Sequence, residues 1–175
     1  MEFKFPKIHD FPPFYTKQPH EGTYKAQIEQ WINIILKYCE FKHIWKLELN
    51  ESNGNYQEIF NNKKIERKIN DNLLQDIINE MIKLEYCKYI NKGDFKNILI
   101  YWKNINEWSL KLIEWINKSG QNGSILTVYE IQNNWPNEEF YGIDDEIIYK
   151  VLEKLEKDKK VACIRENNEI VGIKV

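Results

Sequence analysis

The sequence predicts an α+β protein, mainly helical, in which the same small domain occurs twice after an N-terminal arm. Apolar residues recur at helical spacing in separate segments, and short alternating runs typical of strands lie between and after these segments. One apolar face, at residues 74, 77, 78 and 81, recurs with identical spacing at residues 148, 151, 152 and 155, an offset of 74 residues. A chain of 175 residues has the length of one large domain or two small ones, and this repeat favours two.

The first copy begins with a helix, because its apolar residues fall on one helical face. The residues of this face are Ile28, Trp31, Ile32, Ile35 and Cys39. Asp71 is a good N-cap for a later helix of the same copy. The elements expected after the first helix are a strand at 45–49, a loop at 53–55, a short helix at 63–68, a helix at 71–85, and hairpin strands at 87–90 and 97–102 around a turn at 91–94.

The second copy repeats this order. Trp108, Leu112, Trp115 and Ile116 share a helical face, and the helix stops at 119–120. The elements expected next are a strand at 124–127, a short helix at 128–133 capped by Thr127, a loop at 134–142, a helix capped by Asp144 or Asp145, and hairpin strands at 161–165 and 170–175. Helix, strand, helix, helix and hairpin is the order of a winged-helix domain. We therefore expect two winged-helix domains in tandem, at 21–103 and 104–175, with a boundary near 103–106.

Residues 1–20 differ from the rest of the chain because they contain four of the five prolines together with five aromatic residues. Proline favours extended structure in itself and in the preceding residue, so we expect an extended arm. Residues 12–15 read PPFY, which matches the PPxY pattern that WW domains bind as polyproline II. So many aromatic rings need a groove. That groove lies either on a partner or, as the alternative, on the chain's own first domain.

The sequence offers no constellation typical of catalysis, metal binding or a cofactor. His9, His20 and His43 lack a Cys, Asp or second His at metal-ligand spacing, so we interpret them as solvated surface residues. No glycine-rich phosphate loop follows a predicted strand. Acidic residues at 144–146 suit the first turn of a helix and need no cation to explain them. We therefore expect a non-enzymatic protein without a cofactor.

The cellular setting follows from two further observations. The three cysteines, Cys39, Cys87 and Cys163, lie far apart among apolar residues, so we interpret them as reduced, buried thiols. No stretch approaches the roughly 20 apolar residues of a membrane span, and the N-terminus lacks an apolar run of signal length. We therefore expect a cytoplasmic protein that reaches membranes only through its partners.

Winged-helix domains often bind DNA, so nucleic-acid binding is the main alternative function. A recognition helix needs Arg, Lys, Asn or Gln directed at the major groove. The helix expected at 71–85 carries four acidic residues and one lysine, and its counterpart begins with Asp-Asp-Glu. Phosphates would repel both helices, and the net charge of −2 gives no general attraction to DNA. A protein-binding role is therefore favoured.

Several sequence blocks are more specific than a winged-helix pattern alone, and they extend over nearly the whole chain. They are FPPFYTKQP at 11–19, QIEQW at 27–31, FNN at 60–62, IERK at 65–68, Trp102, EW at 107–108, SGQN at 119–122, TVYE at 127–130 and EEFYGID at 138–144. Together these blocks resemble the small subunit of the ESCRT-II endosomal sorting complex.

The resemblance implies a scaffold role in sorting ubiquitinated cargo into multivesicular bodies at the endosomal membrane. It implies that two copies join a complex with two larger winged-helix subunits, and that the arm docks each copy onto one of them. Residues 12–15 match the family's second PPxY-like motif, Phe11 matches the aromatic residue before it, and 5–6 preserve part of the first motif. The arm residues implied in this contact are Phe5, Pro6, Phe11, Pro12, Pro13, Phe14 and Tyr15.

The resemblance also implies that the second domain recruits an ESCRT-III subunit and nucleates its polymer. The family provides no short motif for that contact. ESCRT-III proteins begin with basic helices, so the acidic end of the second domain is the candidate face. Its residues are Glu138, Glu139, Phe140, Asp144 and Asp145, with Phe140 expected either at the centre of the contact or as an anchor of its own loop.

Overall fold

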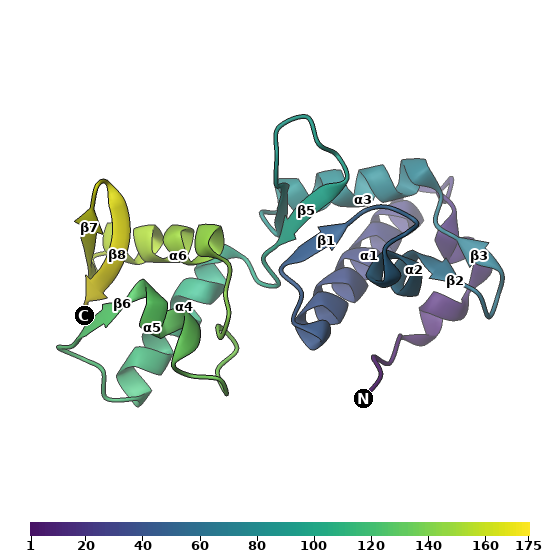
Figure 1. The fold of residues 1–175 in the computed structure, drawn as a ribbon. Coiled ribbons are helices and arrows are strands. Elements are labelled where there is room, and N and C mark those ends of the chain that lie inside the picture. Colours follow the sequence, from purple (N-terminus) through teal and green to yellow (C-terminus); the bar gives the residue numbers. More distant parts are fainter. The chain divides into compact units, whose positions relative to one another are not determined.

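The computed structural model describes all 175 residues as two compact units, Met1–Trp102 and Lys103–Val175 (Figure 1). Each unit combines helices with one three-stranded antiparallel sheet, so the fold is α+β, as predicted. None of the helices is both long enough and apolar enough to span a bilayer.

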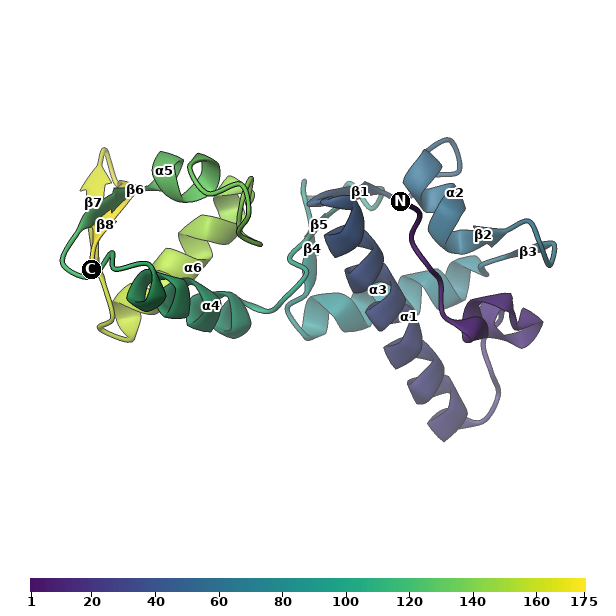
Figure 2. The ribbon, with the colours of Figure 1, turned by 90° about the horizontal axis from the view of Figure 1, so that it is seen from below.

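The first unit contains α1 and α3 as its long helices, and its sheet has the strand order β1-β5-β4 (Figure 2). His20 caps α1, because its Nδ1 accepts a hydrogen bond from the Thr23 amide at 3.2 Å. The elements are η1 Lys7–Asp10, η2 Pro12–Tyr15, α1 Glu21–Lys42, β1 Lys46–Glu48, α2 Gly54–Phe60, β2 Asn61–Asn62, β3 Arg67–Lys68, α3 Asp71–Lys83, β4 Cys87–Tyr89 and β5 Asn97–Ile100.

The core of the first unit forms where α1 packs against α3. Trp31 on α1 is fully buried, and Leu73 on α3 is fully buried as well. The predicted apolar face of α3 is wrong in one position, because Leu74 is only half-buried and Leu73 takes its place. The N-cap is also one residue earlier than predicted. Asn70, rather than Asp71, is the N-cap, because its side-chain oxygen accepts a hydrogen bond from the Asn72 amide at 3.0 Å, and the helix begins at Asp71.

The helix predicted at 63–68 is wrong, and the helix of this region lies at Gly54–Phe60, so it begins within the loop that was expected at 53–55. Asn53 starts it by accepting from the Tyr56 amide at 3.1 Å, and its apolar residues turn toward the core. Residues 61–68 instead form the two-stranded β2–β3 hairpin, in which Asn62 pairs with Arg67. Glu66 adopts a left-handed φ of 53° in the turn, which ends any helical path.

The second unit repeats the helix–strand–helix–helix–hairpin order, and its sheet has the strand order β6-β8-β7. Capping boxes start its first two helices. Asn104 and Glu107 exchange backbone bonds at α4, and Thr127 and Glu130 do the same at α5. The elements are α4 Ile105–Lys118, β6 Ile125–Thr127, α5 Val128–Asn133, α6 Asp145–Lys157, β7 Ala162–Glu166 and β8 Glu169–Lys174.

The core of the second unit lies between α4, α6 and the sheet. Trp108 on α4 and Ile147 on α6 are almost completely buried, at 1% and 0% exposed. Ile147 stands 74 residues after Leu73, so the repeat predicted from sequence extends to a fully buried position of each helix. Gly172 lies where β8 passes β6, and an added Cβ would lie 2.8 Å from the Leu126 carbonyl oxygen.

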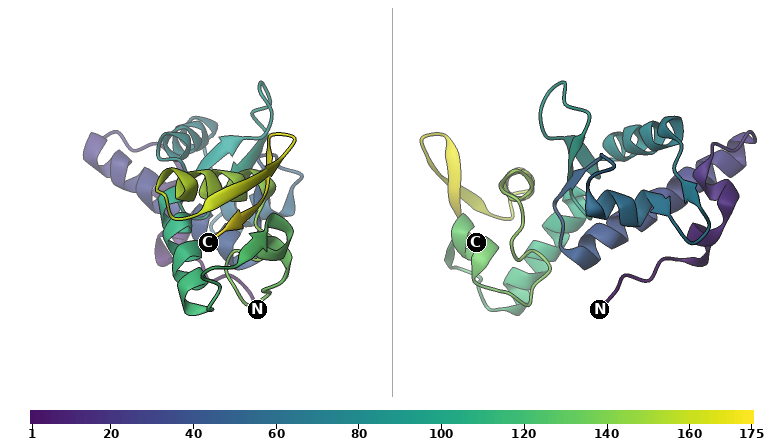
Figure 3. Two further views of the ribbon diagram at one scale, coloured as in Figure 1. Left: turned by 90° about the vertical axis from the view of Figure 1, so that its left-hand side faces the viewer. Right: turned by 45° about the vertical axis from the view of Figure 1, so that its right-hand side comes forward.

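One of the two outer strands of this sheet, β7, belongs to the terminal hairpin shown in yellow in Figure 3. Glu156 on α6 reaches its edge and accepts a hydrogen bond from the Cys163 amide at 3.1 Å. The same carboxylate forms a two-point pair with the Arg165 guanidinium, at 3.0 and 2.6 Å. These bonds lower the pKa of Glu156 to about 2, with the Arg165 hydrogen bond as the largest cause.

Candidate functional site: the N-terminal arm and the acidic end of the second unit

The arm is folded rather than extended, which corrects the prediction. It forms two short 3-10 turns, η1 and η2, that lie against α1 and the β2–β3 hairpin. Pro12 begins η2, where its fixed φ suits the first turn. An N–H at this first position would have no partner within the turn, so its absence in proline costs no hydrogen bond. Proline therefore shapes a compact turn here, because aromatic neighbours find a surface on the chain's own first unit.

Phe14 and Tyr15 are core residues of the first unit, with exposures of 3% and 0%. The Phe14 ring stacks on Trp31 with centroids 4.3 Å apart and an interplanar angle of 8°. The Tyr15 ring meets Trp31 edge-on at 5.3 Å, and its hydroxyl donates to the His9 carbonyl oxygen at 2.8 Å. The expectation that these two rings lie open for a partner is wrong, and the alternative of a groove on the first unit holds for them.

Backbone groups of the arm are also bound by side chains of α1. The Trp31 indole nitrogen donates to the Phe14 carbonyl oxygen at 2.9 Å. The buried Gln27 amide donates to the carbonyl oxygens of Phe14 and Thr16, each at 2.8 Å. Next to Phe14, the Tyr15 carbonyl oxygen accepts a hydrogen bond from the backbone N–H of Asn70, just before α3, at 2.9 Å. The arm is thus held by polar bonds as well as by ring packing.

His9 is buried, at 4% exposed, so its interpretation as a surface histidine is wrong. Its Nε2 lies 2.8 Å from the Ile59 carbonyl oxygen, which can only accept, so Nε2 carries the proton. Asn62 donates to the His9 carbonyl oxygen at 2.8 Å, and Phe5 stacks on the imidazole at 4.0 Å. Burial lowers the pKa of His9, and the bond to Ile59 and the charge of Asp10 only partly oppose this.

The neighbouring carboxylate ties the arm to the β2–β3 hairpin. Asp10 accepts from Lys64 at 2.6 Å and from Asn62 at 2.9 Å. The hydrogen bond from Lys64, followed by that from Asn62, lowers the pKa of Asp10. This exposed pair adds little to stability by itself, since solvent screens it.

One edge of the arm remains open to solvent. Phe11 is 53% exposed, and Pro12, Pro13 and Pro6 are exposed beside it. Phe11 and Pro13 line one side of a groove of about 250 Å³ whose opposite wall is the first turns of α1. The other residues that line this groove are Ile8, Phe14, Gln18, Thr23, Ala26, Gln27 and Gln30. The arm therefore presents an apolar rim that the packed rings hold in place.

The acidic end of the second unit is less open than the sequence suggests. Glu139 bridges two lysines, Lys103 at 2.9 Å and Lys111. Burial alone would raise the pKa of Glu139, but the bonds from Lys111 and Lys103 outweigh burial and lower it. Asp144 is the N-cap of α6 and accepts from the Glu146 amide at 3.0 Å. Part of this charge is therefore used within the fold.

Phe140 is an anchor of its own loop and does not lie at the surface. It is 4% exposed, and its ring meets Trp115 at 5.0 Å. Asp145 is exposed and accepts from the uncharged Gln132 amide at 2.7 Å, and Glu138 is half-buried. Glu138 lines a groove of about 480 Å³ between α4 and the 137–140 loop, whereas Asp145 does not line it.

The remaining candidates for chemistry are dispersed. No three His, Cys, Asp or Glu side chains lie together in a way that could hold a metal ion. Cys39 and Cys87 are buried, and burial raises the pKa of each thiol to about 12. Cys163 is only partly buried, which corrects the expectation for it, because β7 is an edge strand.

Comparison with known proteins agrees with this architecture. Residues 8–144 match the family described as ESCRT-II complex subunit. Vacuolar protein-sorting-associated protein 25 of Danio rerio is 32% identical over 166 residues, covering 94% of both chains. The protein of the same name from Dictyostelium discoideum is 33% identical over 186 residues, covering 98% of this chain and 95% of the relative.

Solved structures give the same result. The crystal structure of subunit VPS25 of the endosomal trafficking complex ESCRT-II aligns with a TM-score of 0.78 and 28% identity, over 98% of this chain and all of the other. A chain in the structure of the ESCRT-II endosomal trafficking complex aligns with a TM-score of 0.79 and 28% identity, over 97% and 98% of the two chains. The protein therefore belongs to the ESCRT-II complex subunit family, as a relative of vacuolar protein-sorting-associated protein 25.

Proposed function

We propose that the chain is a non-catalytic scaffold subunit of an ESCRT-II complex, built from two tandem winged-helix domains at 21–103 and 104–175. The repeated element order and the matching three-stranded sheets support the domain assignment. A similar chain belongs to the endosomal complex ESCRT-II (VPS22/VPS25/VPS36), at 27% identity. By this analogy two copies join two larger subunits in the cytoplasm, and the complex brings them to the endosomal membrane for multivesicular body sorting.

The exposed rim of the arm carries the proposal. Phe14 and Tyr15 are anchors that fix the turn. Phe11, Pro12 and Pro13 are exposed, and Phe11 and Pro13 line the groove on α1. A rim held in one conformation loses little entropy when a partner binds. The rim therefore forms the contact with a larger ESCRT-II subunit, and the two buried rings contribute by holding it.

Co-expression with the larger subunits tests this division of roles. The double variant Phe11→Ala and Pro13→Ala should keep its fold and lose the larger subunits on affinity purification. Truncating an interface anchor costs about 2 kcal/mol or more. Leu84→Ala is the matched control, because Leu84 is 45% exposed in the same unit but lies outside the arm. Equal recovery of the larger subunits with the rim variant and the control would refute the docking role.

We assign recruitment of an ESCRT-III subunit to the second domain, with Glu138 and Asp145 as the steering charges. A basic helix would be attracted to this end, and rim charges act mainly on the association rate. Glu138→Lys with Asp145→Lys should slow capture of the ESCRT-III subunit, most of all at low salt. Glu139 is left unchanged in this variant because it bridges Lys103 and Lys111. An unchanged rate and salt slope would place the contact on another face.

Nucleic-acid binding is the second candidate, and the charge of α3 argues against it. Asp71, Asp76 and Glu80 lie on this helix with Lys83 as its one cation. Binding to random duplex DNA that weakens steeply with salt would favour this candidate over the scaffold role.

A further inference from the structure

The loop between β4 and β5, residues 91–96, carries the most exposed aromatic ring of the first unit. Phe95 is 65% exposed. Its ring meets Tyr89 edge-on at 5.1 Å, which supports one side of the ring and leaves the rest in solvent. The loop projects past α3 at the top of the unit in Figure 1 and again in the right-hand view of Figure 3. Apart from the side that meets Tyr89, the Phe95 ring is therefore mostly left in solvent.

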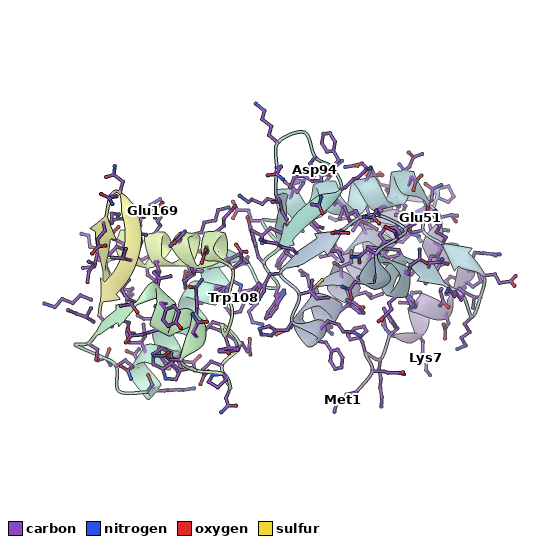
Figure 4. The ribbon with its side chains drawn as sticks, in the orientation of Figure 1. Met1, Lys7, Glu51, Asp94, Trp108 and Glu169 are labelled. Atoms are coloured by element: carbon purple, nitrogen blue, oxygen red, sulfur yellow. The ribbon has the colours of Figure 1, made fainter.

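The loop holds this ring outward in a defined conformation. The Asp94 amide donates to the Asn91 carbonyl oxygen at 3.1 Å, and Gly93 supplies the left-handed φ of 83° that the turn requires. The Asp94 carboxylate accepts from the Asn97 side chain and from the Lys96 amide, both at 2.8 Å. Figure 4 labels Asp94 on this projecting loop. The exposure of Phe95 is thus built into the turn.

The charges beside the ring are mainly positive. Lys92 and Lys96 flank Phe95 and are both exposed. Asp94 is the one carboxylate of the loop, and both of its oxygens accept hydrogen bonds from the loop itself. The projecting tip (Figure 1) carries an apolar ring between two cations along the chain. This pattern suits the boundary of an anionic bilayer, where the ring enters the headgroup layer and ammonium groups meet lipid phosphates.

We propose that the β4–β5 loop is a membrane-contact site for anionic lipid, with Phe95 inserted among the headgroups and Lys92 and Lys96 on the phosphates. This contact adds to the indirect recruitment through the complex. A duplex would suit the loop less well, because a phenyl ring offers no donor to base edges. The acidic α3 beside the loop would also be repelled by the phosphates along a duplex, whereas a bilayer needs only the tip.

Vesicle cosedimentation of the isolated full chain tests the proposal, independently of any ESCRT-II partner. Phosphatidylcholine vesicles are compared with equal mixtures of phosphatidylcholine and phosphatidylserine. The chain should partition onto the mixed vesicles only. Phe95→Ser should lower the partition coefficient roughly tenfold, because the apolar ring no longer enters the headgroup layer. Separately, Lys92→Glu with Lys96→Glu should lower it more, by at least roughly thirtyfold, because each lysine near an anionic surface contributes about fivefold and both charges are reversed. Leu110→Ser is the control, since Leu110 is 68% exposed in the second unit. This variant should bind the vesicles as well as the wild type does.

A fluorescent label shows which face meets the lipid. Phe95→Cys is labelled with an environment-sensitive dye in a Cys163→Ser background, because Cys39 and Cys87 are buried. Mixed vesicles should shift the emission of the dye to shorter wavelength. Three results would each overturn the proposal: no partition of the wild type onto mixed vesicles, partition unchanged by Phe95→Ser, or partition without an emission shift.

Discussion

Replacing Phe14 by alanine should destabilise the first unit strongly, although the residue lies in a proline-rich arm. The Phe14 ring is 3% exposed and stacks on Trp31 at 4.3 Å, so its removal leaves a hole beside the largest core side chain. Phe11 lies three residues earlier in the same turn region but is 53% exposed. The two phenylalanines therefore form a matched pair that separates burial from sequence context.

The size of the loss follows from the packing. Truncating a buried phenylalanine costs about 3–5 kcal/mol, and an aromatic pair contributes about 0.5–1.5 kcal/mol of stacking within that loss. The arm lies at the edge of the unit, where neighbouring groups can close part of the hole. We therefore expect a loss at the low end, about 3 kcal/mol. Phe11→Ala should cost less than about 0.5 kcal/mol, as is usual for an exposed position.

Urea unfolding followed by far-ultraviolet circular dichroism measures this loss. The transition of the first unit should shift to lower urea in Phe14→Ala, and the transition of the second unit should stay in place. Phe11→Ala should superimpose on the wild type. A loss below about 1 kcal/mol for Phe14→Ala, or equal losses for both variants, would refute the claim that the arm is part of the core.

Three further outcomes follow from the same structure. Gly172→Ala should destabilise the second unit by about 1–3 kcal/mol in thermal unfolding, because its Cβ would meet the Leu126 carbonyl oxygen at 2.8 Å. Gly54→Ala is the control and should not destabilise the first unit, because its Cβ would lie in open space. The lowered pKa of His9 favours the neutral folded form, so stability should fall as the pH drops below 6.5, and His9→Gln should flatten this titration. The pKa of Glu156 is about 2 in the fold against 4.5 ordinarily, so the stability that its carboxylate contributes should be lost as the pH falls from 4.5 to about 2. Glu156→Gln should remove this part of the pH dependence from acid unfolding curves.

Regular elements could be predicted where local signals and tertiary packing agree. The helix at Val128–Asn133 is capped by Thr127 as predicted, because Thr127 and Glu130 satisfy each other's backbone amides within a few residues. The segment 63–68 shows the opposite case. Its lysines and glutamate are compatible with a helix, but pairing of Asn62 with Arg67 and the left-handed Glu66 decide the structure. Such pairing depends on the register of the hairpin, and the helix propensities of the individual residues carry no information about that register.

The arm shows how far the candidate site could be read from sequence. Its prolines and aromatic rings mark it as a contact segment, but the sequence leaves open which surface it contacts. The answer depends on Trp31 and Gln27, which lie far along the chain and present a ring face and an amide to the arm. Only the fold brings these partners together, and it divides the motif into buried anchors and an exposed rim.

The carboxylate of Glu156 also has a consequence for the behaviour of free subunits. An outer strand with unused N–H and C=O groups can template the addition of strands from other molecules, and natural proteins cover or charge such edges. Here Glu156 caps the Cys163 amide and pairs with Arg165, so a charged side chain occupies the margin of β7. In a free subunit this charged side chain therefore disfavours the addition of a strand from another molecule at the β7 edge.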